Sequence, residues 1–133
     1  VGETEDSAVS RITILTSGDE QVRDQVLLQL KKLHDVLQVE ILDPQRTVRR
    51  ELMLLKVRVE EQQLSVVQET TKVFRARMVD LAPQSVIVEI TGEQSKLDAF
   101  VTCMEPYGIT ELCRTGLTAI GRGDYTLIKQ EEE

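Results

Sequence analysis

The residues of this sequence that could carry chemistry are few, beginning with one histidine and two cysteines. His34 stands at the end of a predicted helix, Cys103 in a predicted helix and Cys113 in a predicted strand. A zinc site needs about four such ligands, and a nucleophilic thiol needs a base beside it. We therefore expect neither a metal site nor a Cys–His catalytic pair. We expect His34 to be solvated or to face the helix dipole. We expect the two cysteines to be small buried residues, as in a reducing compartment.

Two other patterns invite a functional interpretation. Asp80 and Glu89 lie in neighbouring predicted strands, and paired carboxylates can perform acid–base catalysis. Because no nucleophile or metal cluster accompanies them, we assign both carboxylates to the surface. The segment Gly121-Arg122-Gly123-Asp124 suggests a phosphate-binding loop. It lacks the G-x-G-x-x-G spacing and no helix is predicted after it, so we expect a turn.

Clustered arginines are the remaining candidates for a binding site. Arg49 and Arg50 precede a predicted strand, and Arg75 and Arg77 lie between a predicted helix and a predicted strand. Arginines in such places can bind an anion or the carboxylate of a partner, although solvated charges at the rim of a domain are the commoner case.

The totals limit the partners of the chain. Its 133 residues carry a net charge of −7, which argues against the basic surface that nucleic-acid binding requires. Its apolar runs fall well short of the ~20 residues that span a bilayer. We expect neither nucleic acid nor a membrane as a partner.

The elements that must position these groups are clearest from residue 50 onward. From residue 51 apolar and polar residues alternate, which is typical of a half-buried strand. A helical stripe over 64–74 follows, then two strands joined by a turn at 82–85, a helix from about 93 to 104 and a strand over 109–113. This β-α-β-β-α-β order predicts a ferredoxin-like fold, an antiparallel sheet covered on one side by two helices. The expected core residues are Val57, Val59, Leu64, Val67, Phe74, Val79, Val88, Ile90, Leu97, Phe100 and Val101.

The first 45 residues contain a shorter version of the same pattern. We predict a strand over 9–16, a helix that Ser17 and Glu20 open as a capping box, and a strand over 36–42. The helix should bury a stripe of Val22, Val26, Leu30 and Leu33. The turn Ser17-Gly18-Asp19-Glu20 recurs as Thr91-Gly92-Glu93-Gln94, 74 residues later (92 − 18). We interpret this echo as an internal repeat of two related units.

The repeat predicts an α+β protein of two ferredoxin-like βαββαβ units, the first lacking its opening strand and helix. We place the boundary so that residues 1–45 are the C-terminal part of an N-terminal domain and residues 46–133 are a C-terminal domain. Because the first strand of this fold is central, its absence would leave unpaired backbone groups inside a sheet. We expect the opening strand and helix to precede Val1, or another chain to supply them.

Six segments of the sequence resemble, in order and with similar spacing, the small regulatory subunit of acetolactate synthase (acetohydroxyacid synthase). They are Gln29–Val39, Arg50–Val57, Phe74–Asp80, Thr91-Gly92, Lys96–Ala99 and Arg114-Thr115-Gly116. The resemblance implies an N-terminal ACT domain, which is ferredoxin-like, and a C-terminal domain of related topology. It also implies a chain without catalytic residues or cofactor of its own. Such a chain binds the thiamine-diphosphate-dependent catalytic subunit, activates it and confers feedback inhibition by valine or a related branched-chain amino acid.

The resemblance also implies an effector site and an assembly. In this family the effector pocket draws mainly on elements that would precede Val1, so only Val1 and Gly2 match it, as a remnant of the site. We expect a homodimer or higher oligomer in the cytoplasm of a bacterium, or in a plastid if the source is a plant. The alternatives are another ACT-type ligand-sensing subunit, or a small ferredoxin-like enzyme using Asp80, Glu89 or the arginines.

Overall fold

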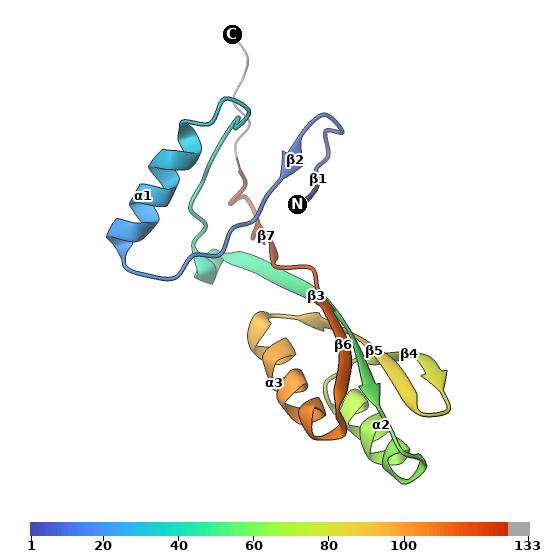
Figure 1. Ribbon diagram of the computed structural model, residues 1–133. Helices are drawn as coiled ribbons and strands as arrows, with labels where there is room; N and C mark the ends of the chain where they lie inside the picture. Colours follow the sequence, from blue (N-terminus) through green and yellow to red (C-terminus); the bar gives the residue numbers. More distant parts are fainter. Residues whose placement is uncertain (128–133) are drawn as a thin grey trace. The chain divides into compact units, whose positions relative to one another are not determined.

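The computed structural model describes residues 1–127, which form two compact units (Figure 1). Unit 1 comprises Val1–Val48 and the segment that begins at Ala119, and unit 2 comprises Arg49–Thr118. The predicted second domain ran from residue 46 to the C-terminus, whereas the chain returns to unit 1 after Thr118. The reason is pairing, because strand β7 (Thr118–Gly121) pairs with the start of strand β3 and Arg122 donates its N–H to the carbonyl of Arg46 at 2.7 Å.

Unit 2 is an antiparallel sheet with two helices on one face (Figure 1). Its strands lie in the order β4-β5-β3-β6, which places the first strand of the unit at the centre as in a ferredoxin-like fold. This confirms the predicted β-α-β-β-α-β order. The bounds are β3 (Thr47–Arg58), α2 (Leu64–Val73), β4 (Arg77–Ala82), β5 (Ser85–Gly92), α3 (Gln94–Met104) and β6 (Ile109–Arg114).

The alternation in β3 decides which side chains face the helices. Met53, Leu55 and Val57 are fully buried, while Leu54 and Lys56 point to the open face of the sheet. The register from Glu51 opposite Gly92 to Arg58 opposite Ser85 is continuous, so the alternating residues of β5 fall in phase. Val86, Val88 and Ile90 therefore share the core with them.

The core of unit 2 is completed by the two helices. Phe100 of α3 is fully buried and meets Phe74 edge to face, with ring centroids 5.2 Å apart. Most of the predicted core is confirmed, with Leu64, Phe74 and Val101 packed against it as partly buried residues. Val79 is wrong, because a bulge in β4 between Met78 and Asp80 leaves it unpaired and 47% exposed. The members of the buried apolar cluster that the prediction did not name are Met53, Leu55, Val86 and Met104.

Unit 1 has little regular structure besides one helix. Strands β1 (Gly2–Glu3) and β2 (Ser10–Arg11) form a two-residue ladder, helix α1 spans Glu20–Lys31, and a single 3₁₀ turn covers Pro44–Arg46. The predicted strands over 9–16 and 36–42 are wrong. The first is reduced to Ser10–Arg11, and the described residues 36–42 lie outside any helix or strand. Alternating apolar residues form a strand only where a neighbouring backbone pairs with them.

Helix α1 likewise departs from the prediction. All of its residues remain at least partly exposed, with Val22 44% exposed and Leu33 beyond its end 55% exposed, so the predicted buried stripe is wrong. Its N-cap is Asp19, whose carboxylate accepts the N–H of Val22 at 3.0 Å, and not Ser17.

The two helix-opening turns of the repeat nevertheless share a geometry. Helix α3 begins after Glu93, in the same relation to Gly92 as Asp19 has to Gly18. Gly18 has φ 131° and Gly92 φ 159°. A Cβ on either glycine would crowd the side chain four residues later, at 3.3 Å for Val22 and 2.6 Å for Lys96. Both turns therefore favour glycine for the same reason.

Candidate functional site

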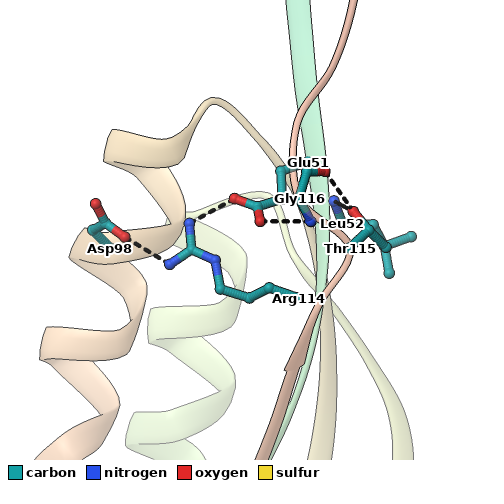
Figure 2. A network of polar contacts seen from close by, with 6 residues as sticks. All are labelled: Glu51, Leu52, Asp98, Arg114, Thr115 and Gly116. Carbon is teal, nitrogen blue, oxygen red and sulfur yellow. Dashed lines mark hydrogen bonds and ion pairs between the residues drawn. The ribbon is translucent and has the colours of Figure 1, made fainter. Parts of the chain in front are cut away.

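A buried carboxylate organises the end of the unit 2 sheet. Glu51 lies in phase with the inward residues of β3 and is 4% exposed. A carboxylate removed from water must be paired and hydrogen-bonded. Arg114 Nη2 donates to Glu51 Oε1 at 2.6 Å and the N–H of Gly116 donates to Oε2 at 2.9 Å (Figure 2). Both carboxylate oxygens are thus occupied.

The arginine of this network joins three elements. Arg114 ends β6 opposite Met53, and its Nη1 donates to Asp98 of α3 at 2.7 Å (Figure 2). Hydrogen bonds to Glu51 and Asp98 raise the pKa of the Arg114 guanidinium above its usual range. The guanidinium therefore stays charged near neutral pH, and the network ties helix α3 to strands β3 and β6.

A backbone pairing extends the network past the end of β6. The N–H of Leu52 donates to Thr115 Oγ1 at 3.1 Å, and the N–H of Thr115 donates to the carbonyl of Leu52 at 3.0 Å. The network Glu51–Asp98–Arg114–Thr115–Gly116 (Figure 2) thus fastens the two chain segments that lead out of unit 2. Because both oxygens of Glu51 are occupied and the Arg114 guanidinium bridges two carboxylates, the arrangement is suited to holding the fold.

Sequence reasoning missed this network, although two signals were available. Glu51 occupies an inward position of the β3 alternation, which predicts a buried acid in need of a cation. Arg114-Thr115-Gly116 was noted only as a segment of the resemblance. Asp98 offered no signal, since an acid on the exposed face of a helix is ordinary.

The predicted effector residues lie far from any such network along the chain. Val1 is 92% exposed, and Gly2 begins β1, where it pairs with Arg11 of β2. The role of both residues in effector binding stays a prediction.

The structure does not bring the candidate carboxylates together. Asp80 stands opposite Ile87, and Glu89 stands opposite Arg77 on one side and Leu54 on the other. Residues 1–127 contain no group of three or more histidine, cysteine, aspartate or glutamate side chains that could hold a metal ion.

The other small motifs are placed as follows. His34 is exposed and residues 122–124 form a turn, as predicted. Cys103 and Cys113 are both exposed free thiols, so their predicted burial is wrong. Cys113 lies opposite Leu54 on the open face of the sheet, and Cys103 lies one position off the buried stripe of α3.

In the described part of the chain, the helices are too short or too polar to cross a membrane.

The arginines of the sequence pattern have different surroundings. Arg49 forms an ion pair with Glu93 at 3.1 Å, and Arg50 donates to the carbonyl of Arg49. Arg75 and Arg77 are exposed at the turn between α2 and β4, and Arg75 has a positive φ of 53°. Arg49 is therefore already paired with a carboxylate of the chain itself.

Comparison with known proteins assigns the chain to a family. The family described as small subunit of acetolactate synthase matches residues 50–123, and the acetohydroxyacid synthase small-subunit-like ACT domain matches residues 1–38. The chain belongs to the acetolactate synthase small subunit family. This confirms the resemblance seen in the sequence, and it supports a regulatory subunit of branched-chain amino-acid biosynthesis.

Individual members of the acetolactate synthase small subunit family cover both units. The probable acetolactate synthase small subunit of Methanothermobacter thermautotrophicus is 44% identical over 96% of this chain and 76% of its own length. That of Archaeoglobus fulgidus is 42% identical over 93% of this chain and 77% of its own. The crystal structure of the Thermotoga maritima small subunit matches with a TM-score of 0.72 and 34% identity, over 81% of this chain and 68% of that one.

Proposed function

We propose that this chain is a non-catalytic regulatory subunit that binds the thiamine-diphosphate-dependent catalytic subunit of acetolactate synthase in the cytoplasm. It raises the activity of that subunit and confers feedback inhibition by valine or a related branched-chain amino acid. The observation that carries the proposal is the family match over both units, together with a relative that is 44% identical over 96% of this chain.

The proposed mechanism is differential binding. An effector that binds one arrangement of the assembly more tightly shifts the holoenzyme toward that arrangement, and only as far as the two affinities differ. The ACT-type unit is the proposed receiver of the amino acid, with Val1 and Gly2 contributing. Because Val1 is exposed and Gly2 is already paired with Arg11, we expect residues 1–133 alone to bind the amino acid weakly. The charged ends of the ligand need fixed polar partners that these two residues do not supply.

The assembly is proposed to be a homodimer or higher oligomer that docks on the catalytic subunit. Exposed apolar residues in both units, such as Leu15 and Leu54, support association, since such surface is usually covered. Light scattering at high micromolar concentration should give a mass above that of one chain, and a strict monomer would count against this part of the proposal.

The functional proposal is tested by co-purification with the catalytic subunit, followed by calorimetry. The tagged chain should retain the catalytic subunit, and the isolated chain should show no turnover of pyruvate. Calorimetric titration with valine, leucine and isoleucine should give weak or undetectable binding to residues 1–133. Failure to retain the catalytic subunit would defeat the proposal, and turnover by the isolated chain would favour a ferredoxin-like enzyme instead.

A further inference from the structure

The turn that connects α2 to β4 holds an arginine in a backbone conformation that favours glycine. Past the end of α2 the N–H of Arg75 donates to the carbonyl of Lys72 at 3.0 Å and the N–H of Ala76 donates to that of Thr71 at 2.9 Å. These bonds close the helix through a left-handed residue, a position that glycine normally occupies. Arg75, at φ 53°, is the one residue other than glycine with positive φ in the described chain. An L side chain destabilises this conformation relative to glycine.

The positive charges at Arg75 and Arg77 have no ion-pair partner within the described structure. Arg75 and Arg77 are exposed, and among residues 1–127 neither guanidinium has a carboxylate within ion-pair distance. Glu89 stands opposite Arg77 in the strand register but does not reach it. The C-terminus of a helix favours a cation, and Lys72 already supplies one in the last turn of α2.

Exposed apolar residues flank the two arginines in the sequence. Val73, the last residue of α2, is 79% exposed, and Val79 of the edge strand β4 is 47% exposed. Arginine beside exposed apolar side chains is typical of protein-binding surfaces, where arginine is enriched among the residues that dominate affinity. Residues in strained backbone conformations also cluster at functional sites.

We propose that this corner, formed by Val73, Arg75 and Arg77, is a docking surface for a carboxylate-bearing face of the catalytic subunit. The inference rests on the proposed function, and it names the surface of unit 2 that would contact the catalytic subunit. The argument for an acidic partner is charge complementarity, because two guanidinium groups that have no carboxylate partner among residues 1–127 stand on a chain of net charge −7. Guanidinium groups bind carboxylates in bidentate pairs and steer association between oppositely charged surfaces.

The test exploits the strain at Arg75. Arg75→Gly removes the charge and relieves the left-handed conformation, so its unfolding midpoint in denaturant should equal or exceed that of the wild type. Its affinity for the immobilised catalytic subunit should nevertheless fall about tenfold or more, with a weaker dependence on salt. Arg77→Gln should weaken binding in the same direction, and Arg75→Lys should retain part of the affinity.

The matched control is Arg58→Gln, which removes another exposed arginine of unit 2 that has no ion pair among the described residues. It should leave affinity unchanged. Wild-type affinity in both Arg75→Gly and Arg77→Gln would overturn the docking surface while leaving the proposed function intact. A wild-type chain that does not bind the catalytic subunit would overturn the proposed function as well. A lower unfolding midpoint for Arg75→Gly would contradict the strain from which the inference starts.

Discussion

Helices α1 and α3 follow corresponding turns of the internal repeat, yet only one of them has a core. Helix α3 buries Leu97, Phe100 and Met104 against the sheet of unit 2. Helix α1 has apolar residues at comparable spacing, and all of them remain at least partly exposed. The difference lies in what faces the helix, since unit 2 presents four paired strands and the ladder of unit 1 consists of two residue pairs. An amphipathic stripe is buried only where a second layer exists to receive it.

This comparison assigns the intrinsic stability of the chain to unit 2. Burial of apolar area is the main favourable term in folding, and the fully buried side chains of the described chain belong to unit 2. Unit 1 instead exposes many large apolar side chains. Exposed apolar surface of this kind is typical of a region that another protein surface covers. They include Ile12, Ile14, Leu15, Val22, Leu28, Leu33 and Leu37.

The largest expected effect is the loss of the central ring of unit 2. Phe100→Ala removes a fully buried side chain that contacts Phe74, and should lower the free energy of unfolding by roughly 3–5 kcal/mol. Chemical denaturation followed by circular dichroism measures this loss of stability. An unchanged midpoint would show that the ring is not part of a packed core.

The next effect concerns the polar network at the end of the sheet. Arg114→Ala leaves the buried Glu51 without its cation, and should cost about 2–3 kcal/mol. We place it below the 3–5 kcal/mol of a fully buried pair because the Arg114 side chain is 24% exposed. Asp98→Ala is the control, and its exposed carboxylate should contribute less than about 1 kcal/mol. Equal costs for the two variants would contradict the role given to Glu51.

The pH dependence of this contribution follows from the raised pKa of Arg114. A cation whose pKa is raised on folding stabilises the protein fully below its unfolded pKa, and loses that contribution only as pH rises through the folded value. Arg114 should therefore not titrate near neutral pH. The difference in the free energy of unfolding between the wild type and Arg114→Ala should stay constant there. Urea midpoints of both proteins at mildly acidic and mildly alkaline pH measure this. A gap that narrows with rising pH near neutrality would contradict it.

The smallest effect is expected in unit 1. Val22→Ala should change the stability of the isolated chain by less than about 0.5 kcal/mol, because that side chain is 44% exposed. Hydrogen exchange should likewise show weak protection in α1 and strong protection in β3 and β5. Protection of α1 equal to that of α3 in the isolated chain would remove the contrast between the two units.

The sequence pattern predicted unit 2 well because its signals were local. Alternation in β3 and β5 and the stripe of α3 each depend on neighbours a few residues away. The failures came from interactions that composition does not encode. The bulge at Val79 shifts β4 by one residue, and Cys113 takes the open face because its register with Leu54 decides its environment. The strands expected over 9–16 and 36–42 had suitable residues and lacked strand partners.

The candidate site, too, was predictable only in part from the sequence. The family could be seen from ordered segments such as Arg114-Thr115-Gly116, yet the role of those residues became visible only when β3, α3 and β6 were brought together (Figure 2). The strain at Arg75 could not be predicted, because arginine is a common residue near the C-terminus of a helix. Only the backbone shows that it occupies a position suited to glycine.

The most direct test of the account is the rate of acetolactate formation by the catalytic subunit as this chain is added. The account predicts a saturable rise in rate with wild-type chain, an equal rise with Arg58→Gln, and a rise at higher concentrations of chain with Arg75→Gly. The complete assembly should also become sensitive to a branched-chain amino acid. A rate that stays constant at every concentration of the folded chain would contradict the regulatory function itself.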